Sequence, residues 1–578
     1  MLKRMPMTSL VGGAIAAACG LAVLALAGCV SPGRIDPDLL TRYQEAVLKN
    51  SPQPRAGEDG LDLLRPAPGR AVAPLKIVKD PKGGRGAVHL SLDEAIRLAL
   101  ANSLEIGVVG FDPAISRQQM IEAAAAFDYV LFGESSHTRS DRRSPTALAA
   151  SQSRTVPVKV GVRNTNVHGG VAELSWSLTR HSDNSPFTLP DPRYESITTL
   201  QVTQPLLRRA GRDYNLAALH LARLNHKASR AQFRDKVEEI VAQVQSLYWT
   251  LVQAREDVRI QQELLDRTIE TLDRVKKRRK IDATEVVIKQ TEAAVHSRRA
   301  LLIRSRTTAD NMQDQLARLL ADERIGIANG CGVKPTDLPV AKPVTIDVAS
   351  QLVSALRHNP LLEQARLGIA AADVNVRVAR NETLPVLNLV ASVGLQGLNR
   401  HGEKGVNDML RGHFLDHTVG LTFEIPLGNR AARAALRGQR LRRLKSVTEM
   451  RDMADKVAVA VREAVREIRT TFDEMNAQAA AVKASQLQLK ALDVLEKKTE
   501  RLTPVFLQLK LQTQESVARA QRAEIQARVS YHNALVQLTR ITGTTLQLHN
   551  IRLAVDDSIE AGIPLDEPDE PAPGKGPG

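Results

Sequence analysis

The chain of 578 residues has few aromatic side chains and little cysteine. Phe, Trp and Tyr make up 3% of the residues, which is thin for several independent globular cores, because aromatic residues contribute heavily to such cores. Two of the three cysteines lie in the first 29 residues, within an apparent export signal. The remaining Cys331 cannot by itself form a disulfide framework or a Cys-based metal site. Beyond the N-terminal region no apolar run reaches 18 residues, so no spanning helix is predicted there.

Proline and glycine are absent from the stretch Arg212 to Lys280. At 1.5 Å per residue, a helix over this stretch would be on the order of 100 Å long. Its apolar residues recur at spacings of three and four, which predicts one apolar stripe along a helix. The residues of this stripe include Val237, Ile240, Val241, Val244, Leu247, Tyr248 and Leu251. A second such rod is predicted from Asn429 to about Arg501, and rods of this length indicate a coiled coil, a repeat array or a tube wall.

Catalytic motifs are also missing. The sequence has no His-Glu-x-x-His, no Gly-x-Ser-x-Gly and no phosphate-binding glycine loop. His401, His413 and His417 fall in a predicted loop and strand edge, a weak pattern for a metal site. We therefore predict that the chain is not an enzyme and has no catalytic residue, metal site or cofactor other than a covalent lipid.

The formal net charge is +15. In a cytosolic protein this excess would suggest nucleic-acid binding. In an exported protein the same charges are expected on solvated helix faces near anionic membrane surfaces. We predict no nucleic-acid partner.

The N-terminus has the pattern of an export signal. Lys3 and Arg4 precede an apolar run that ends in Leu26-Ala27-Gly28-Cys29. This sequence resembles the lipobox of bacterial lipoproteins, which implies a signal peptide over 1–28 and a covalent lipid, such as palmitate, on Cys29. Val30 favours delivery to the outer membrane. The alternative is an ordinary signal peptide that ends by chance in cysteine. Residues 29–90, rich in Pro, Gly and Arg, are predicted to form a tether.

The body of the chain contains an internal repeat. Asn102-Ser103-Leu104 resembles Asn359-Pro360-Leu361 at an offset of 257, and Asp235-Lys236-Val237 resembles Asp455-Lys456-Val457 at an offset of 220. In each half the sequence predicts a short helix, strands, a long rod and a returning helix. The short helices are Leu92 to Phe127 in the first half and Asp347 to Arg380 in the second. The returning helices run from Thr284 to Leu320 in the first half and to about Ile541 in the second. We divide the chain into a first repeat, 91–322, an equatorial connection, 323–346, a second repeat, 347–545, and an acidic, Pro-rich tail, 546–578, that is predicted to be disordered.

Strands are predicted where apolar and polar residues alternate. A soluble β-sandwich would alternate in the same way, but the export signal favours a membrane sheet. Four to six strands cannot close a barrel, and an open edge in lipid is costly, so several copies must share one barrel. The predicted strands are Asp128–Ser135, Val156–Thr165, Val171–Thr179, Tyr194–Leu206, Leu384–Leu398 and His417–Leu427. Because the two repeat offsets, 257 and 220, differ by 37, the first half carries about 37 extra residues, which we expect at the Val156–Thr179 pair.

This duplicated order, with junctions at Gln204-Pro205-Leu206 and Ile425-Pro426-Leu427-Gly428, resembles the TolC-type outer-membrane efflux and secretion channels, in their lipoprotein branch. The fold class implied is mainly α with membrane β: a duplicated long-helix bundle forming an α-helical tunnel, with four to six strands per chain in a shared trimeric β-barrel. The resemblance implies a homotrimer, a 12-stranded barrel, outer-membrane lipid around it, and a periplasmic adaptor and inner-membrane pump as partners. The channel would serve passive efflux or type I secretion.

The resemblance also suggests where function resides. The periplasmic gate is expected at the rod tips, where the second tip carries Lys510 and lacks acidic residues between Arg501 and Gln514. A ring of positive charge there would repel cations, so Lys510→Glu is expected to change ion selectivity. Alternatively, these residues face the adaptor or solvent. The candidate tip residues are Lys280, Asp282, Glu285, Arg501, Pro504 and Lys510.

The barrel–rod junctions are expected at Pro205, Gly211, Pro426 and Gly428. A basic helix face follows the second junction and is expected to contact lipid head groups or solvent. It consists of Arg430, Arg433, Arg437 and Arg440. The competing overall hypothesis is a lipid-anchored periplasmic coiled-coil scaffold or adaptor without a pore.

Overall fold

The computed structural model describes residues 77–78, 87–143, 149–185, 187–279, 284–322, 325, 332–339, 342–498 and 503–553. All of them belong to one compact unit, Leu63–Gly578. The predicted signal peptide and most of the predicted tether and tail lie outside the described residues. So do four of the candidate site residues, Cys29, Lys280, Asp282 and Arg501.

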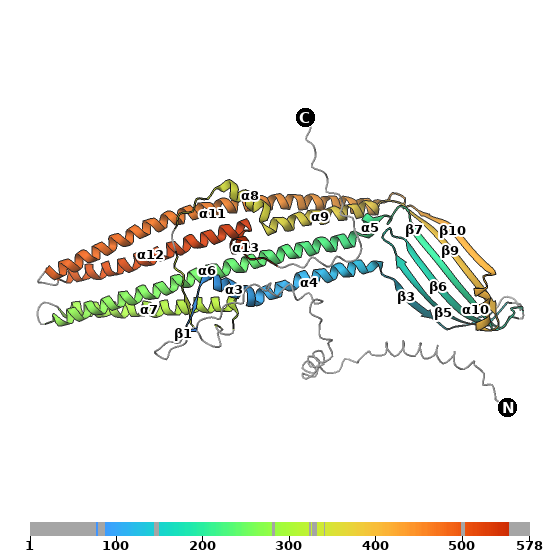
Figure 1. The fold of residues 1–578 in the computed structure, drawn as a ribbon, viewed down its shortest axis with the longest axis horizontal. Helices are drawn as coiled ribbons and strands as arrows, with labels where there is room; N and C mark the ends of the chain where they lie inside the picture. The colour runs from blue at the N-terminus through green and yellow to red at the C-terminus, as the bar shows by residue number, and fades with distance from the viewer. Residues whose placement is uncertain are drawn as a thin grey trace, which may run out of the picture. The chain divides into compact units, whose positions relative to one another are not determined.

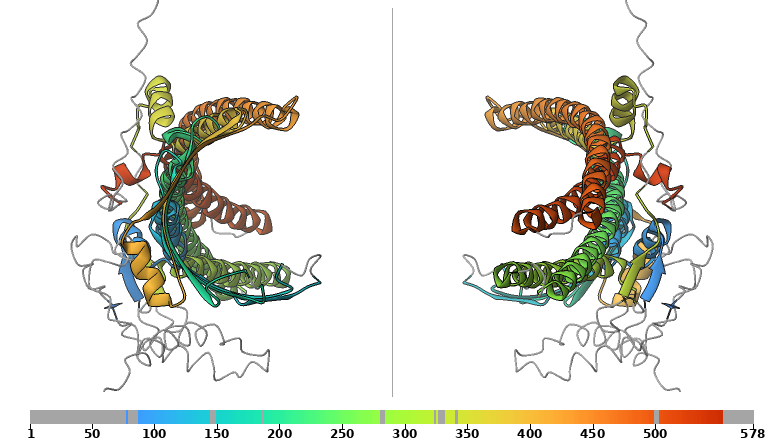
Figure 2. Two further views of the ribbon diagram at one scale, coloured as in Figure 1. Left: turned by 90° about the vertical axis from the view of Figure 1, so that its right-hand side faces the viewer. Right: turned by 90° about the vertical axis from the view of Figure 1, so that its left-hand side faces the viewer.

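Four long helices dominate this unit, as predicted from the two rods and their returning partners. The first rod is α6, Ala217–Lys277, preceded by the single turn α5, Arg212–Asn215, and the second is α11, Arg430–Lys498. Their partners are α7, Glu285–Leu320, and α12, Pro504–Thr542. The pairs α6–α7 and α11–α12 form two antiparallel hairpins, and α12 packs on α6. Figure 2 shows these helices arranged along a curved layer that continues into the sheet.

The two short helices are each broken, so the prediction of one continuous helix in each half was wrong. The first half has α3, Leu92–Asn102, α4, Leu104–Ala124, and a 3₁₀ turn η2, Ala125–Phe127; the second has α8, Val348–His358, and α9, Pro360–Asn381. Asn359 has extended backbone, as expected before proline, and its side chain caps α9 by accepting from Leu361 N at 2.9 Å. The equivalent Ser103 is also non-helical.

The helices of the described part include none that is, alone, both long and apolar enough to cross a membrane. The bent pair formed by α3 and the segment Leu104–Phe127 passes that test by length and composition only.

One antiparallel sheet joins the two halves of the chain. Its order is β10-β9-β7-β6-β5-β3, with β4 also paired to β5. Since β3 and β4 follow the same register along β5, they form one interrupted edge strand, and the sheet is six strands wide. The strands are β3, Val130–Ser135, β4, Thr138–Asp141, β5, Gln152–Thr165, β6, Val171–Asp183, β7, Arg193–Pro205, β9, Val386–Asn399, and β10, Phe414–Glu424.

The extra residues of the first half lie inside this sheet. The hairpin of β5 and β6 is paired on both sides, to the β3–β4 edge and to β7. The ladder between β7 and β9 then connects the first half to the second. The fold class is therefore confirmed at the level of helix hairpins and a sheet of four to six strands, and in the single chain this sheet is open.

Several small elements were not predicted. The segment around His401, expected to be loop, contains helix α10, Gly402–Leu410; two glycines in nine residues weaken its helical pattern. A second sheet combines β1, Ile77–Val78, β2, Ala87–Leu90, and β8, Gly332–Pro335, so part of the predicted tether and part of the connection form strands. A short helix α13, Thr545–Leu548, follows α12, and its Leu546 is buried in the core, so the prediction that the tail is disordered from residue 546 was wrong for its first residues.

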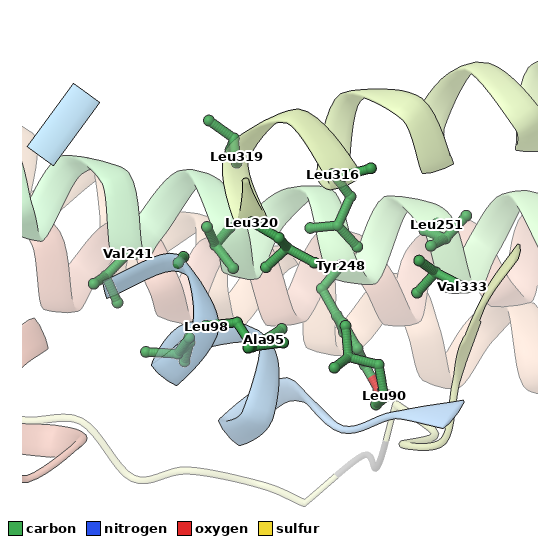
Figure 3. Close-up of a cluster of buried hydrophobic side chains, with 14 of the residues drawn as sticks. Leu90, Ala95, Leu98, Val241, Tyr248, Leu251, Leu316, Leu319, Leu320 and Val333 are labelled. Carbon is green, nitrogen blue, oxygen red and sulfur yellow. The ribbon is translucent and has the colours of Figure 1, made fainter. Parts of the chain in front are cut away.

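Buried clusters hold the helices together midway along their length. In the first half, Tyr248 is fully buried among Leu90, Leu316 and Val333, as Figure 3 shows. Its hydroxyl donates to Leu90 O at 3.0 Å and accepts from Asp337 N at 3.1 Å. The predicted repeat is visible here, because Val237 and Val457, at equivalent positions, are buried in the two separate cores.

Candidate functional site

The large sheet has one apolar face and one polar face. No bulge interrupts any of its ladders, so side chains alternate strictly between the faces. The apolar face includes Val160, Val162, Leu174, Trp176, Leu178, Leu200, Val202, Leu389, Val393, Leu395, Val419, Leu421 and Phe423. The polar face includes Lys159, Arg163, Glu173, Ser175, Ser177, Glu195, Thr199, Gln201, Ser392, Gln396, Asp416, Thr418 and Thr422.

The apolar face is exposed over a height that suits a bilayer. Val419 keeps 74% of its surface exposed, which is unusual for a β-branched residue in a strand. The apolar face runs from Phe423 at one end to Tyr194 at the other. Phe423 pairs with Leu387 of β9, and Tyr194 pairs with Asn399 of β9. The twelve steps between those residues cover about 40 Å along the strand and about 28 Å of depth at a 45° tilt. The hydrocarbon core of a bilayer is about 30 Å thick.

The two edges of this sheet are unpaired in the described chain. β10 pairs only with β9, and the β3–β4 edge pairs only with β5. Exposed strand edges template pairing with another chain, and unpaired backbone groups are costly in lipid. Each edge is therefore open to pairing with a strand of another chain.

The predicted junction residues lie where the sheet meets the rods. Pro205 is the last residue of β7 and pairs with Asn388, and Pro426 follows β10 by two residues. Gly211 and Gly428 have φ of +93° and +84°, a conformation that glycine adopts at low cost. Gly211 directly precedes the turn α5 that leads into α6, and Gly428 lies two residues before α11, so the two junctions are similar in the two repeats.

A polar network missed by the sequence analysis ties these junctions together. Glu382, just after α9, accepts from Arg208 Nε at 2.6 Å, from Arg209 Nε at 3.2 Å and from the Tyr214 hydroxyl. Burial raises the pKa of Glu382, but these hydrogen bonds outweigh it, and the pKa lies below its ordinary value. One carboxylate of the second half thus holds three side chains of the first. No local motif distinguishes Glu382 in the sequence.

The predicted basic face lies on the first turns of α11. Arg430, Arg433, Arg437 and Arg440 are all exposed. Within the described residues they form no ion pair, whereas Arg443, three residues further on, pairs with Asp373 of α9. The four side chains are therefore available to lipid head groups or solvent.

At the far tips, the described candidate residues begin the returning helices. Glu285 is the first residue of α7 and pairs with Arg279 at 3.2 Å. Pro504 is the first residue of α12, and Thr503 caps that helix by accepting from Phe506 N at 3.2 Å. Lys280, Asp282 and Arg501 lie outside the described residues.

Lys510 does not have the position that the selectivity hypothesis requires. Its side chain is 2% exposed, and its ammonium group contacts Asp493 Oδ1 at 2.8 Å and Glu496 Oε2. The second tip therefore carries acidic residues on α11, opposite the acid-free stretch of α12. Because these carboxylates neutralise Lys510 within the hairpin, Lys510→Glu would mainly disrupt packing and is not a clean test of ion selectivity.

Contacts between the hairpins near the tips were also missed. Arg298 of α7, 5% exposed, donates to Gln514 Oε1 at 3.1 Å and to Leu511 O at 2.8 Å, both on α12. Arg274 of α6 pairs with Glu496 of α11 at 3.3 Å. These side chains come from distant parts of the sequence, and only the packing of α6 and α7 against α11 and α12 brings them together.

The chain is similar to a known family and to solved structures. Residues 352–544 match the family described as outer membrane efflux protein. The structure is similar to the outer membrane protein VceC from Vibrio cholerae, with 16% identity over 78% of this chain and 96% of that one and a TM-score of 0.57. It is also similar to the outer membrane channel CmeC of Campylobacter jejuni, with 14% identity over 80% and 87% and a TM-score of 0.57.

A third similar structure is the open state of the outer membrane channel MtrE of Neisseria gonorrhoeae, with 16% identity over 78% of this chain and 88% of that one and a TM-score of 0.56. No curated protein matches the sequence. At these identities the structures establish the fold. The family and the solved structures are outer-membrane channels, which are not enzymes, and together they support an efflux channel function in the Gram-negative outer membrane.

The resemblance to TolC-type channels is thus confirmed: residues 352–544 match the outer membrane efflux protein family, and the described chain has the fold of the outer-membrane channels of that type.

Proposed function

We propose that the chain forms a homotrimeric outer-membrane channel that acts as the passive conduit of a tripartite efflux or type I secretion system. The observation that carries this proposal is the two-faced sheet with two unpaired edges, connected directly to helices of 61 and 69 residues. Helices of this length are about 90 and 100 Å long. In the trimer the apolar face contacts lipid, the polar face lines the lumen, and the helices extend the lumen into the periplasm.

The width of the sheet argues for a larger barrel than the 12 strands that the resemblance implied. Three chains with six strand positions each give eighteen strands, the size at which barrels enclose an aqueous channel. The turn between β5 and β6 supports this, because it packs at the junction, where Gly211 N donates to His168 O at 3.2 Å. The hairpin of β5 and β6 therefore spans the same length of the sheet as the neighbouring strands.

The periplasmic partners are an adaptor and an inner-membrane pump, and we propose that they act on the helix tips. Arg298 and the ion pair of Arg274 with Glu496 connect the two hairpins there. The covalent lipid is proposed on Cys29. Labelling with palmitate should be abolished by Cys29→Ser and retained in Cys19→Ser; unchanged labelling of Cys29→Ser would exclude that site.

The alternative, a lipid-anchored scaffold without a pore, is disfavoured by the apolar face. A soluble sheet would not leave Leu174, Leu421 and Phe423 more than half exposed. Reconstitution of the full-length protein separates the two functions. A channel gives a heat-modifiable trimer band and stepwise conductance in a planar bilayer, both lost after boiling. A scaffold gives a monomer band and no conductance.

A further inference from the structure

Three arginines gather at one end of the apolar face, the end remote from the helices. Arg139 of β4 and Arg154 of β5 are direct cross-strand partners. Arg180 of β6 pairs with Val156 and is therefore the diagonal neighbour of Arg154 on the same face. All three side chains are exposed. We call Arg139, Arg154 and Arg180 the arginine cluster.

The cluster lacks the carboxylate partners that charged residues have on the polar face. There, Lys159 pairs with Glu173 at 2.8 Å and Arg193 with Asp183 at 2.8 Å. Among the described residues, no ion pair involves Arg139, Arg154 or Arg180, and residues 144–148 and 186, outside that part, contain no Asp or Glu in the sequence. The nearby Asp141 accepts from Gln152 Nε2 at 3.3 Å. Like charges directly opposite in a sheet are destabilising, so this arrangement favours a bound anion.

Helix α10 lies on the same face at this end of the sheet. Figure 1 shows it at the far end of the sheet, and in Figure 2 it lies on the convex side. Ser196 and Thr198 of β7 donate to Met409 Sδ at 3.3 and 3.2 Å, and any side chain at Gly397 would collide with Gly405 and Met409. Away from these contacts the helix exposes Glu403 and Lys404, and Arg411 after its end pairs with Asp408 at 3.7 Å, so these charges balance.

Tyr194 connects the helix to the cluster. Its ring lies 6.0 Å from the Arg180 guanidinium, and Gly402 at the start of α10 lies against the same ring. Tyrosine commonly occupies the boundary between acyl chains and polar head groups. Tyr194 and Arg180 are direct cross-strand partners, and Arg139 and Arg154 lie one row further out. The face therefore changes from apolar rows to a row that holds Tyr194 and Arg180 and then to Arg139 and Arg154, which matches the layers of one bilayer leaflet.

We propose that the arginine cluster, flanked by α10, binds the phosphate groups of lipid A, the glycolipid of the outer leaflet. Guanidinium groups hold phosphate oxygens in bidentate pairs, and the apolar rows beside them would contact its acyl chains. The inference rests on the proposed function in one respect, that this sheet crosses the outer membrane with its far end outward.

The test compares full-length trimers purified in detergent and incubated with diphosphoryl lipid A. Arg154→Gln/Arg180→Gln removes two charges from the apolar face. The matched control is Lys159→Gln/Arg163→Gln, which removes two charges from the polar face of β5. Native mass spectrometry measures the lipid A retained. The cluster variant should bind roughly 10- to 30-fold more weakly than wild type, and the control should bind as wild type does.

A second variant tests the part played by α10. Gly397→Ala displaces that helix without changing charge and should also weaken retention, whereas Gly420→Ala, where an added Cβ meets open space, should not. Equal retention by the cluster variant and its control would overturn the inference. Bilayer conductance of the same preparations separates failure of the lipid site from failure of the proposed function. If the cluster variant forms conducting trimers and retains as much lipid A as wild type, only the lipid site is refuted. If the wild-type protein gives no conductance, the proposed function is refuted.

Discussion

Leu200 of β7 and Val393 of β9 lie directly opposite each other in the ladder that joins the two halves of the chain, and each keeps 47% of its surface exposed. A core residue at such a central position in a sheet would be covered. Their exposure on the same face means that an apolar environment outside the chain covers them. This pair therefore links the duplicated architecture to a membrane, since neither half alone builds the continuous apolar face.

The two faces of the edge strand β10 should respond oppositely to charge. Val419→Arg puts a cation on the apolar face near mid-depth and is expected to cost about 2–4 kcal/mol of stability in lipid. Thr418→Arg, one residue away on the polar face, should leave stability nearly unchanged and shift ion selectivity toward anions. Urea unfolding in vesicles and bilayer reversal potentials measure these effects. Equal destabilisation by both substitutions would contradict the assignment of faces.

The Glu382 network should make the junction sensitive to acid. Because the folded-state pKa of Glu382 lies below its ordinary value, the carboxylate stabilises the fold above the unfolded pKa of about 4.3. That contribution is lost as pH falls through the folded value. Glu382→Gln should lower the melting temperature at pH 7 and flatten its dependence on pH below about 4.3. A parallel pH dependence in wild type and variant would show that the network does not contribute.

Loss of Lys510 should loosen the second helix tip. Lys510→Met leaves the half-exposed Asp493 and the mostly buried Glu496 without their cation, which is expected to destabilise the tip. Hydrogen exchange in residues 504–515 should accelerate. Lys490→Met, at an exposed position of α11, is the control and should leave exchange unchanged. Unchanged protection in Lys510→Met would mean that the pair is unimportant in solution.

Arg298 should restrain the two hairpins against each other. Arg298→Ala removes its hydrogen bonds to Gln514 and Leu511 and is expected to raise single-channel conductance, because α7 and α12 are then free to separate. Arg299→Ala removes the same charge from the neighbouring exposed position and should conduct as wild type does. If both variants conduct alike, the contact does not limit the aperture.

The long helices were predictable because Arg212 to Lys280 lacks proline and glycine and keeps one apolar stripe. The alternation of Leu174, Trp176 and Leu178 with Ser175 and Ser177 likewise predicted the two faces. The break at Ser103 was missed, since serine, unlike Pro360 in the second half, does not by itself end a helix. The partners of Lys510 and Glu382 could not be predicted, because pairing across a helix tip or a junction depends on tertiary packing that local sequence does not encode.

The central claim is that three copies close one barrel through the edges of their sheets. Electron cryomicroscopy of the full-length protein in lipid nanodiscs tests it most directly. The account predicts three chains around a continuous eighteen-stranded barrel, with β10 of one copy paired to β3 and β4 of the next. A single chain whose β10 and β3 edges remain unpaired, or a sheet lying outside the lipid, would contradict it.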